Sequence, residues 1–419
     1  MSTETTNTDE IDFVSTGPGT IGGRYLRRFW HPMYLARDLA KGRAVPIRVM
    51  GEEFTLYRGE SGQAYVTVQR CPHRGTQLST GSVRGEQLSC RYHGWTFDPT
   101  GQCTAQPAEP QPFCSKVRVA TYPAREAIGF IFAYLGEGTP PPFPEWPKLG
   151  QFLHRHRMDC NYFQSAENIV DDVHLHFSHR NSVLRRSRRS GIPRVFAHLT
   201  PFGLTQELRH ERSTELNHFI MPNMCYLQFD HRKPRATVSA LFAYVQIDDT
   251  HHSHYTSMRI TTSLPKVIDK LVLGLAAWLA ARWNVDKDEW FSRKTQEVLS
   301  GKSTFDRIAN PRLQDTVMCA GQGVIADRSA ERLGKSDAAV ILLRKIWKRE
   351  LRLLMEGRPV TQFTFPRFEA SGAVVGLDLA EGAGDPNTGA AGERRQVWAR
   401  APHDSENKRD YVFTQYGKR

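Results

Sequence analysis

Two short cysteine–histidine motifs constrain the fold of this chain more than any other feature of its sequence. Cys71 and His73 stand in the run CPHRG, and after sixteen intervening residues Cys90 and His93 stand in CRYHGW. Each run offers one thiol and one imidazole, with a glycine close behind the histidine. Two thiolates and two imidazoles suit tetrahedral zinc or an iron–sulfur cluster. The fold must therefore bring two loops together around a metal.

The distribution of the four residues separates these two kinds of site. Structural zinc usually takes two closely spaced cysteines from one run and two closely spaced histidines from another. A Rieske [2Fe-2S] centre needs a mixture instead, because two cysteines ligate one iron and two histidines ligate the other. We predict a Rieske cluster held by Cys71, His73, Cys90 and His93, with zinc as the alternative.

The sequence around the motifs predicts a small antiparallel β domain. Between Val45 and Tyr134 short apolar runs alternate with turn signals, and Gly59–Gln63 and Asp98–Gln102 have the composition of hairpin turns. The proline-rich segment Gly136–Pro147 then predicts a linker. The two loops would lie at the tip of this domain.

The second half of the chain predicts a mixed architecture. Strand-like runs such as LNHFIM and ATVSALFAYVQI are followed by two expected helices, Pro265–Arg282 and Asp337–Met355. Strands followed by helices in this order favour the α+β class. Pro32 limits a basic, aromatic segment near the start to a short helix.

Cysteine usage and hydropathy bear on the compartment. Seven cysteines among 419 residues do not suggest a disulfide framework, and the first residues resemble no secretory leader. The longest nearly uninterrupted apolar run, Leu271–Ala281, is too short to cross a bilayer. We expect a cytoplasmic protein that is not inserted in a membrane.

The net charge of +12 invites a nucleic-acid interpretation. Half of the excess falls in 180–213, where eight arginines face two glutamates. Binding of single strands needs stacking aromatic residues, and this segment offers only Phe196 and Phe202. A solvated loop, attraction of an anionic aromatic compound and docking of an acidic redox partner all remain open. We expect no nucleic-acid partner.

With these motifs the chain resembles the Rieske non-haem iron oxygenases, the ring-hydroxylating α-subunit family. The resemblance covers residues 18–368 and includes GRYLRRFWHP at Gly23–Pro32 and TGQCTAQPAEP at Thr100–Pro110, which favour the phthalate dioxygenase and aryl O-demethylase branch. Respiratory Rieske proteins carry a further cysteine after each half-motif. Thr76 and Tyr92 stand at these positions here, which disfavours that group.

The resemblance implies an α+β fold with a Rieske domain and a helix-grip (START-like) catalytic domain built on an antiparallel sheet. The implied division is a flexible N-terminus (1–20), an N-terminal helix packed on the catalytic domain (21–44), the Rieske domain (45–140), the catalytic mononuclear iron domain (141–370) and a flexible tail (371–419).

The family pattern Asp-x₂-His-x₄-His falls on Asp171, His174 and His179. The resemblance makes the two histidines Fe(II) ligands. Regular helix geometry alone would pair His176 with His179 instead, because positions five apart point away from each other. Asp172 is one residue too close to His174 to fit the pattern.

The third iron ligand implied by the resemblance is a carboxylate at the start of a late helix. SDAAVILLRKIW fits this description, so Asp337 is the expected ligand, and Asp315, Asp327 and Glu331 compete with it. Asp171 would not bind iron. It would bridge His174 to His93 of a neighbouring subunit, which implies a ring of subunits, usually a homotrimer.

The expected function is that of a terminal oxygenase with one [2Fe-2S] Rieske cluster and one mononuclear Fe(II) per chain. It would use O₂ and electrons from NAD(P)H, delivered by a separate ferredoxin or flavin reductase, to hydroxylate, cis-dihydroxylate or O-demethylate an aromatic compound that is anionic, as the charge favours. The alternative is a Rieske-type electron-transfer protein without oxygenase activity. The substrate cannot be predicted, because no motif marks the residues around it.

Overall fold

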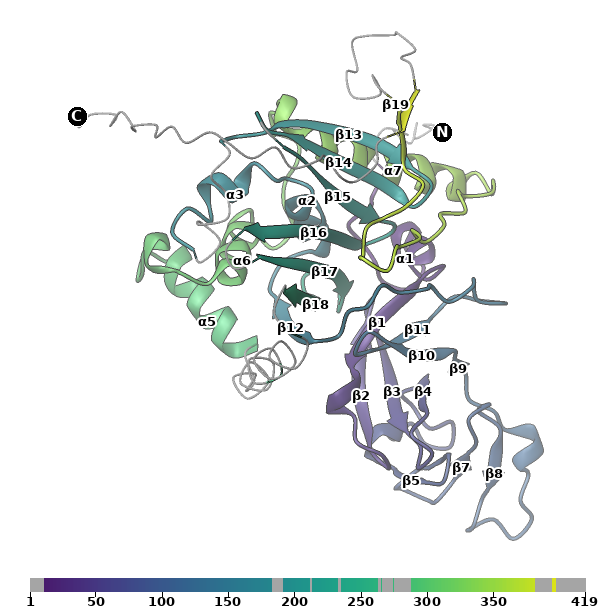
Figure 1. The fold of residues 1–419 in the computed structure, drawn as a ribbon. Helices are drawn as coiled ribbons and strands as arrows, with labels where there is room; N and C mark the ends of the chain where they lie inside the picture. Colours follow the sequence, from purple (N-terminus) through teal and green to yellow (C-terminus); the bar gives the residue numbers. More distant parts are fainter. Residues whose placement is uncertain are drawn as a thin grey trace, which may run out of the picture.

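The computed structural model describes residues 11–182, 191–211, 213–232, 235–262, 265, 274, 288–380 and 394–396. Figure 1 shows a small β domain below a larger part built on one extensive sheet. The expected helix Pro265–Arg282 lies almost wholly outside the described residues, as do arginines 185, 186, 188 and 189. No helix among the described residues is long and apolar enough to span a membrane.

The small domain consists of two four-stranded antiparallel sheets. One has the order β2-β3-β4-β9 and the other β5-β6-β7-β8. Their strands are β2 (Ala44–Val49), β3 (Glu52–Arg58), β4 (Ala64–Val68), β5 (Ser82–Arg84), β6 (Gln87–Ser89), β7 (Thr96–Phe97), β8 (Cys103–Ala105) and β9 (Thr121–Tyr122). Both expected hairpin turns are confirmed, since Gly59 N–H donates to the Gln63 carbonyl and Asp98 N–H to the Gln102 carbonyl.

A third sheet connects the small domain to the main core. Its order is β1-β11-β10, formed by β1 (Trp30–Leu35), β11 (Phe130–Tyr134) and β10 (Ala124–Ala127). Segment 21–44, expected to be helical, is an α-helix only over α1 (Ile21–Leu26), because Pro32 lies in a strand. The expected linker packs through Phe143 and Trp146 against Phe132.

The large part is a seven-stranded antiparallel sheet in the order β12-β18-β17-β16-β15-β14-β13. Its strands are β12 (Phe152–Met158), β13 (Arg194–Thr200), β14 (Gly203–Arg209), β15 (Thr214–Ile220), β16 (Met224–Arg232), β17 (Arg235–Gln246) and β18 (His252–Thr262). Helix α7 (Ala338–Met355) packs on β13, β14 and α1, with Trp347 fully buried among Tyr25 and Phe163. This arrangement confirms the α+β class and the antiparallel-sheet domain.

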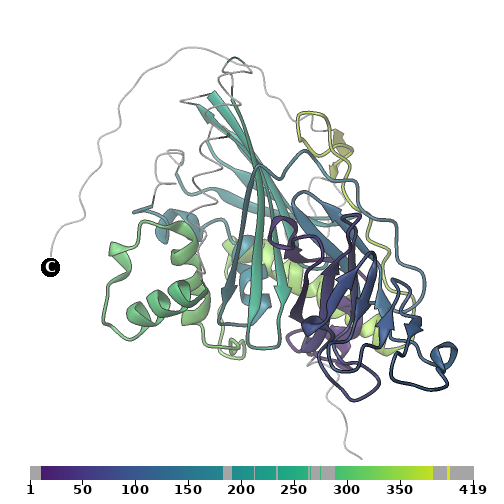
Figure 2. The same ribbon diagram turned by 90° about the horizontal axis from the view of Figure 1, so that it is seen from below.

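A second group of helices lies at the opposite side of this sheet from the small domain (Figure 2). The group comprises α5 (Asp288–Leu299) and α6 (Pro311–Gly321), next to α3 (His174–Phe177), whereas α2 (Tyr162–Ile169) lies between α6 and α7, with Phe163 against Trp347. Helix α5 contacts β12 and α6, and α2 contacts α6. Pro311 occupies the first turn of α6, and Asn310 caps it by accepting a hydrogen bond from Arg312 N–H.

The remaining elements are short. They are η1 (Ala36–Asp38), η2 (Leu78–Thr80), η3 (Cys114–Lys116), η5 (Phe305–Arg307), η6 (Lys335–Asp337), β19 (Asp378–Ala380) and β20 (Arg394–Gln396). Strands β19 and β20 pair with each other inside the segment expected to be a flexible tail. In the described part of the arginine-rich segment, Arg180 pairs with Asp306 and Arg209 with Glu207.

Candidate metal centres

Two loops of the small domain repeat one backbone conformation. In the β4–β5 loop, Cys71 N–H donates to the Thr76 carbonyl at 2.9 Å and Gly75 N–H donates to the Cys71 carbonyl at 2.9 Å. In the β6–β7 loop, Cys90 N–H donates to the Trp95 carbonyl at 2.8 Å and Gly94 N–H donates to the Cys90 carbonyl at 3.0 Å. The glycines adopt φ of 72° and 73°, a region that favours glycine. Each motif thus folds into the same compact turn.

The side chains of these loops separate into a buried thiol pair and a more exposed imidazole pair. Cys71 and Cys90 are 2% and 4% exposed. Burial, together with the neighbouring Cys90 thiol, raises the pKa of Cys71 to about 11. The rings of His73 and His93 are half-buried, with centroids 4.5 Å apart, and His73 stacks on Trp95 at 4.6 Å.

This division fits the donor set of a Rieske cluster. The two thiols could ligate an inner iron and the two imidazoles an outer iron. A bound metal would remove the thiol protons, because thiolates are the ligating form. The structure thus brings together the four residues predicted from the sequence.

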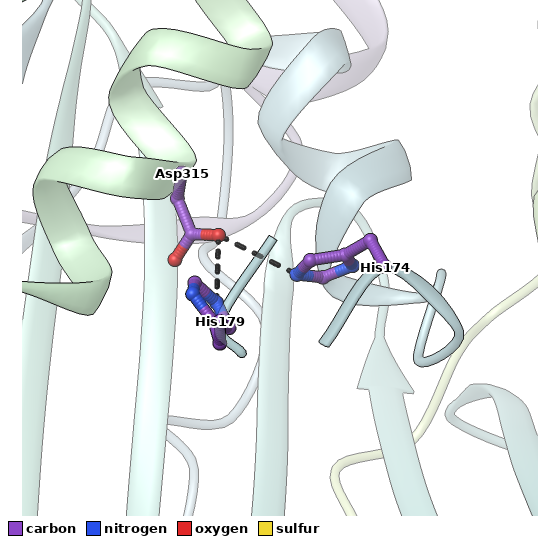
Figure 3. A group of neighbouring side chains, drawn as sticks. All are labelled: His174, His179 and Asp315. Carbon is purple, nitrogen blue, oxygen red and sulfur yellow. Dashed lines mark ion pairs between the residues drawn. The ribbon is translucent and has the colours of Figure 1, made fainter. Parts of the chain in front are cut away.

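A second group of metal-binding side chains lies between α3 and α6. Figure 3 shows Asp315 from α6 facing His174 and His179. Asp315 Oδ1 lies 3.4 Å from His174 Nε2 and 3.1 Å from His179 Nε2. One ligand atom of each residue falls within 4.8 Å of the others. Two histidines and one carboxylate form the donor set typical of non-haem Fe(II) sites with open positions.

Hydrogen bonds on the far side of each ring orient both histidines. His179 Nδ1 donates to Gln314 Oε1 at 2.7 Å, and His174 Nδ1 donates to the backbone carbonyl of Asp171. These bonds leave Nε2 of each ring as the atom that faces Asp315. His174 Nε2 is buried and has no hydrogen-bond partner in the described part of the chain, as expected of a ligand atom. The residues therefore fit a bound metal.

The electrostatics of the group favour the ionised form of Asp315 and the protonated form of His174. Burial opposes ionisation of Asp315, but His174 and His179 outweigh it and lower the pKa of this carboxyl well below its usual range. Burial likewise opposes protonation of His174, but Asp315 and then Asp171 outweigh it and raise the pKa of the ring. A carboxylate that stays ionised next to two imidazoles is suited to a divalent cation.

The structure corrects the choice of carboxylate. Asp337, the residue expected from the sequence, does not join the two histidines. It stands at the start of α7, where its Oδ2 accepts a hydrogen bond from Gly334 N–H at 2.6 Å. An acidic residue at this position is explained by the partial positive charge of a helix N-terminus.

Asp327 and Glu331, the two remaining carboxylates that competed for this role, make contacts elsewhere. Asp327 accepts a hydrogen bond from Ser329 N–H, and Glu331 pairs with Arg344. Neither belongs to the group formed by the two histidines and Asp315. Among the carboxylates weighed from the sequence, Asp315 is therefore the one that the fold brings to the histidines.

The local backbone explains why His179 rather than His176 joins the group. His176 is not part of it, although regular helix geometry favoured this residue. The distortion that the motif required is present, because α3 ends at Phe177 and His179 lies beyond it. Gln314, which sequence reasoning missed, could have been suspected only from its position beside Asp315.

Asp171 lies beside the second group without belonging to it. Its Oδ2 is 3.8 Å from His174 Nδ1, and its Oδ1 accepts a hydrogen bond from Val173 N–H at 3.2 Å. Burial raises the pKa of this carboxyl. The side chain nevertheless keeps 32% of its surface exposed, so a contact from outside the chain can reach it.

The two candidate centres lie far apart within the chain. The cysteine–histidine loops are in the small domain near β5 and β7, whereas α3 and α6 lie beyond the large sheet (Figures 1 and 2).

Comparison with known proteins supports the same interpretation of the small domain. The Rieske [2Fe-2S] domain family model matches residues 29–123. The 5,5'-dehydrodivanillate O-demethylase oxygenase subunit of Sphingobium sp. is 29% identical over 357 residues, covering 81% of this chain and 79% of the relative. The phthalate 4,5-dioxygenase oxygenase subunit of Pseudomonas putida is 26% identical over 363 residues, covering 77% and 81%.

Solved structures share the fold. An NdmA mutant of Pseudomonas putida CBB5 with theobromine superposes with a TM-score of 0.59 at 17% identity, covering 79% of this chain and 92% of that one. Dicamba monooxygenase bound to dicamba gives a TM-score of 0.56 at 15% identity, covering 80% and 99%. Two loops built for a Rieske cluster, the match to the Rieske domain family, oxygenase relatives along most of the chain and this shared fold lead to one conclusion: the chain carries a Rieske [2Fe-2S] domain and fits the Rieske oxygenase α-subunit family.

Proposed function

We propose that this terminal oxygenase uses O₂ and NAD(P)H-derived electrons to hydroxylate, cis-dihydroxylate or O-demethylate a small aromatic acid. The observation that carries the proposal is the convergence of His174, His179 and Asp315, with both Nε2 atoms facing the Asp315 carboxylate. A Rieske-type electron carrier without oxygenase activity would have no use for this second group.

The residues of the chain divide the work between two centres. Cys71, Cys90, His73 and His93 would hold the [2Fe-2S] cluster, and His174, His179 and Asp315 would hold one Fe(II). When bound, the cluster supplies single electrons and the Fe(II) supplies open coordination positions for O₂. Gln314 and the Asp171 carbonyl hold the imidazole rings so that Nε2 stays directed at the metal position.

The proposed assembly is a ring of subunits, a homotrimer. Since the two centres lie on different sides of one chain, Asp171 of one subunit would contact His93 of a second copy. The partly exposed Asp171 side chain and the half-buried His93 ring are both available for such a contact. Light scattering of the purified protein would give the mass of the assembly, and a monomer would contradict this part of the proposal.

An external reductase is the proposed electron donor. One relative over 112 residues, 40% identical, is the oxidoreductase NdmD of Pseudomonas putida. One fold neighbour, carbazole 1,9a-dioxygenase, was solved as an oxygenase and ferredoxin complex, with a TM-score of 0.53. A ferredoxin or flavin reductase is the kind of partner that would serve this chain.

The substrate class rests on the relatives and on charge. Relatives named for phthalate, 3-chlorobenzoate and phenoxybenzoate act on aromatic acids, and this chain carries a net charge of +12. The test is oxygen uptake by the iron-loaded protein with a reductase and NADH, over a panel of aromatic acids and methoxy-aromatics. We expect substrate-dependent uptake with a hydroxylated or demethylated product. Reduction of the cluster with no product from any member would contradict the proposal.

A further inference from the structure

Asn168 contacts the carboxylate of the second metal-binding group from outside that group. Its side-chain Nδ2 donates a hydrogen bond to Asp315 Oδ1 at 3.3 Å. The same oxygen lies 3.4 Å from His174 Nε2 and 3.1 Å from His179 Nε2. Asn168 is half-buried near the end of α2, whereas Asp315 stands on α6. An amide donor thus contacts the carboxylate oxygen that faces both imidazole rings.

A second amide on α2 fixes how this helix packs on α6. Gln164 stands four residues before Asn168 and is fully buried. Its Nε2 donates to the carbonyls of Cys319 at 2.8 Å and Gly323 at 2.9 Å. Cys319 stands four residues after Asp315 on α6. Because positions four apart share one face of a helix, the two amides of α2 face the two positions of α6 in a single register. The packing of the two helices therefore holds the Asn168 amide opposite the carboxylate.

The backbone that follows Asn168 is fixed as well. The Asn168 carbonyl accepts a hydrogen bond from Asp171 N–H at 3.2 Å. Gln206, a fully buried residue of β14, donates from Nε2 to the Val170 carbonyl at 2.7 Å. The Asp171 carbonyl in turn accepts a hydrogen bond from His174 Nδ1. Asn168 thus belongs to the hydrogen-bonded turn that orients His174, so its amide does not move freely with the carboxylate.

This hydrogen bond matters for a carboxylate that binds a metal. A carboxylate oxygen has more than one lone-pair site, so Asp315 Oδ1 can bind a metal and accept from an amide N–H at the same time. The amide also restricts rotation of the carboxylate group. Partners of this kind orient ligating carboxylates and strengthen metal binding. A carboxylate without such a donor is free to turn and to offer both oxygens to the metal.

We propose that Asn168 is a positioning residue that restrains Asp315 to bind the metal through one oxygen. The second oxygen would otherwise occupy a coordination position that a non-haem Fe(II) site keeps open. This inference deepens the proposed function and rests on it, since it requires a metal at His174, His179 and Asp315. It adds to the site a residue that is not itself a ligand.

The test uses the full-length protein with its [2Fe-2S] cluster intact and with Co(II) loaded at the second group after a mild chelator has removed the Fe(II). X-ray absorption at the cobalt edge reports the ligands of this metal alone, because the cluster contains iron. Asn168→Leu removes the donor at similar volume. We expect one additional oxygen neighbour at cobalt and Fe(II) binding weakened about 10-fold, measured by competition with a chelator. Asn168→Gln keeps an amide donor and should recover part of both properties.

Asn181→Leu is the matched control. Asn181 Nδ2 also donates to an aspartate, Asp306 Oδ1, at 2.9 Å, but this exposed carboxylate is not part of the metal-binding group. The control should leave the cobalt spectrum and the Fe(II) affinity at their wild-type values. If Asn168→Leu does not fold, Asn168→Ala removes the same donor with a smaller side chain and should give the same changes.

The outcomes separate this inference from the proposed function. A cobalt spectrum that is unchanged in the Asn168 variants would overturn it, even if Fe(II) binding weakens, because that pattern shows a merely structural role. The same spectral change in Asn181→Leu would also overturn it. Wild-type protein that binds neither Co(II) nor Fe(II) at the second group would contradict the proposed function instead. Oxygen uptake is not part of the readout, so a failed oxygenase assay would contradict the proposed function alone.

Discussion

The two candidate centres of this protein are built in opposite ways. The cysteine–histidine loops lie within 25 consecutive residues, 71–95, and both repeat one hydrogen-bonded turn. The His174, His179 and Asp315 group joins a short helix to a residue on another helix well over a hundred positions away. A local centre is specified by spacing and turn-forming glycines. A distributed centre depends on how the helices pack on the large sheet.

The difference also extends to how the ligand side chains are held. In the small domain the backbone turn itself positions Cys71 and Cys90. In the large domain Gln314 and the Asp171 carbonyl orient the rings of His179 and His174 from outside the group. We therefore expect the first centre to be lost or weakened when its ligands or glycines are substituted. The second centre should be sensitive to substitutions of its ligands and also of residues that do not contact a metal.

The largest effect should come from removing a ligand of the local centre. Cys71→Ser replaces a thiolate with a hydroxyl that does not ionise at neutral pH, so the cluster should not assemble. Visible absorption and EPR of the reduced protein should lose the Rieske signal. Cys160→Ser removes a buried thiol outside both groups and should keep the signal. A Rieske signal retained in Cys71→Ser would show that the ligand assignment is wrong.

The second-largest effect should distinguish Asp315, the carboxylate that the structure places beside the two histidines, from Asp337, the carboxylate expected from the sequence. Asp315→Asn should weaken iron binding at the second group at least about 100-fold while leaving the Rieske signal intact. Asp337→Asn is the matched control. It should retain the iron and cost about 0.5 kcal/mol of stability, because the amide loses the favourable charge interaction with the start of α7. Iron analysis after dialysis measures both variants, and the reverse pattern would restore Asp337 as the ligand.

The third effect tests positioning at a distance from the metal. Gln314→Leu removes the acceptor for His179 Nδ1 and should lower iron affinity about 10- to 100-fold without affecting the Rieske cluster. Gln314→Glu keeps an acceptor for His179 Nδ1 but loses the hydrogen bond that Gln314 Nε2 donates to the Ile308 carbonyl, so it should lose less iron affinity than Gln314→Leu. Competition with a chelator of known affinity gives both values. Equal iron affinity in the two variants would show that Gln314 does not position His179 for metal binding.

The smallest effect compares the two similar turns of the local centre. Gly75 and Gly94 both have positive φ, so alanine should cost about 1 kcal/mol at each. At Gly94 a Cβ would also lie 2.7 Å from Pro107 Cγ, whereas at Gly75 no heavy atom lies within 4 Å. This overlap should cost about 1–3 kcal/mol more. Thermal unfolding should therefore give Gly94→Ala a lower melting temperature than Gly75→Ala. Equal melting temperatures would mean that the proline moves away freely.

The same contrast explains what could be predicted from the sequence. Hairpin turns, strand alternation and the motif spacing act locally, so the small domain and its four candidate ligands followed from the residues. The choice of His174 and His179 needed a family resemblance, because α3 ends before His179 and helix periodicity is misleading there. Asp315 stands in the first half of α6 and Asp337 immediately before α7, and sequence pattern alone does not show which of these helices packs against α3. Only the packing of α6 beside α3 decides between them.

The central claim is that one chain holds two separate iron centres. Iron and protein determination on the purified wild-type protein tests it most directly, before and after treatment with a mild chelator. We expect about three irons per chain at first, since a Rieske cluster holds two and the His–His–carboxylate group holds one. Chelation should then leave about two irons per chain and an unchanged Rieske EPR signal. A protein that contains only two irons at saturation, all of them in the cluster, would contradict the account.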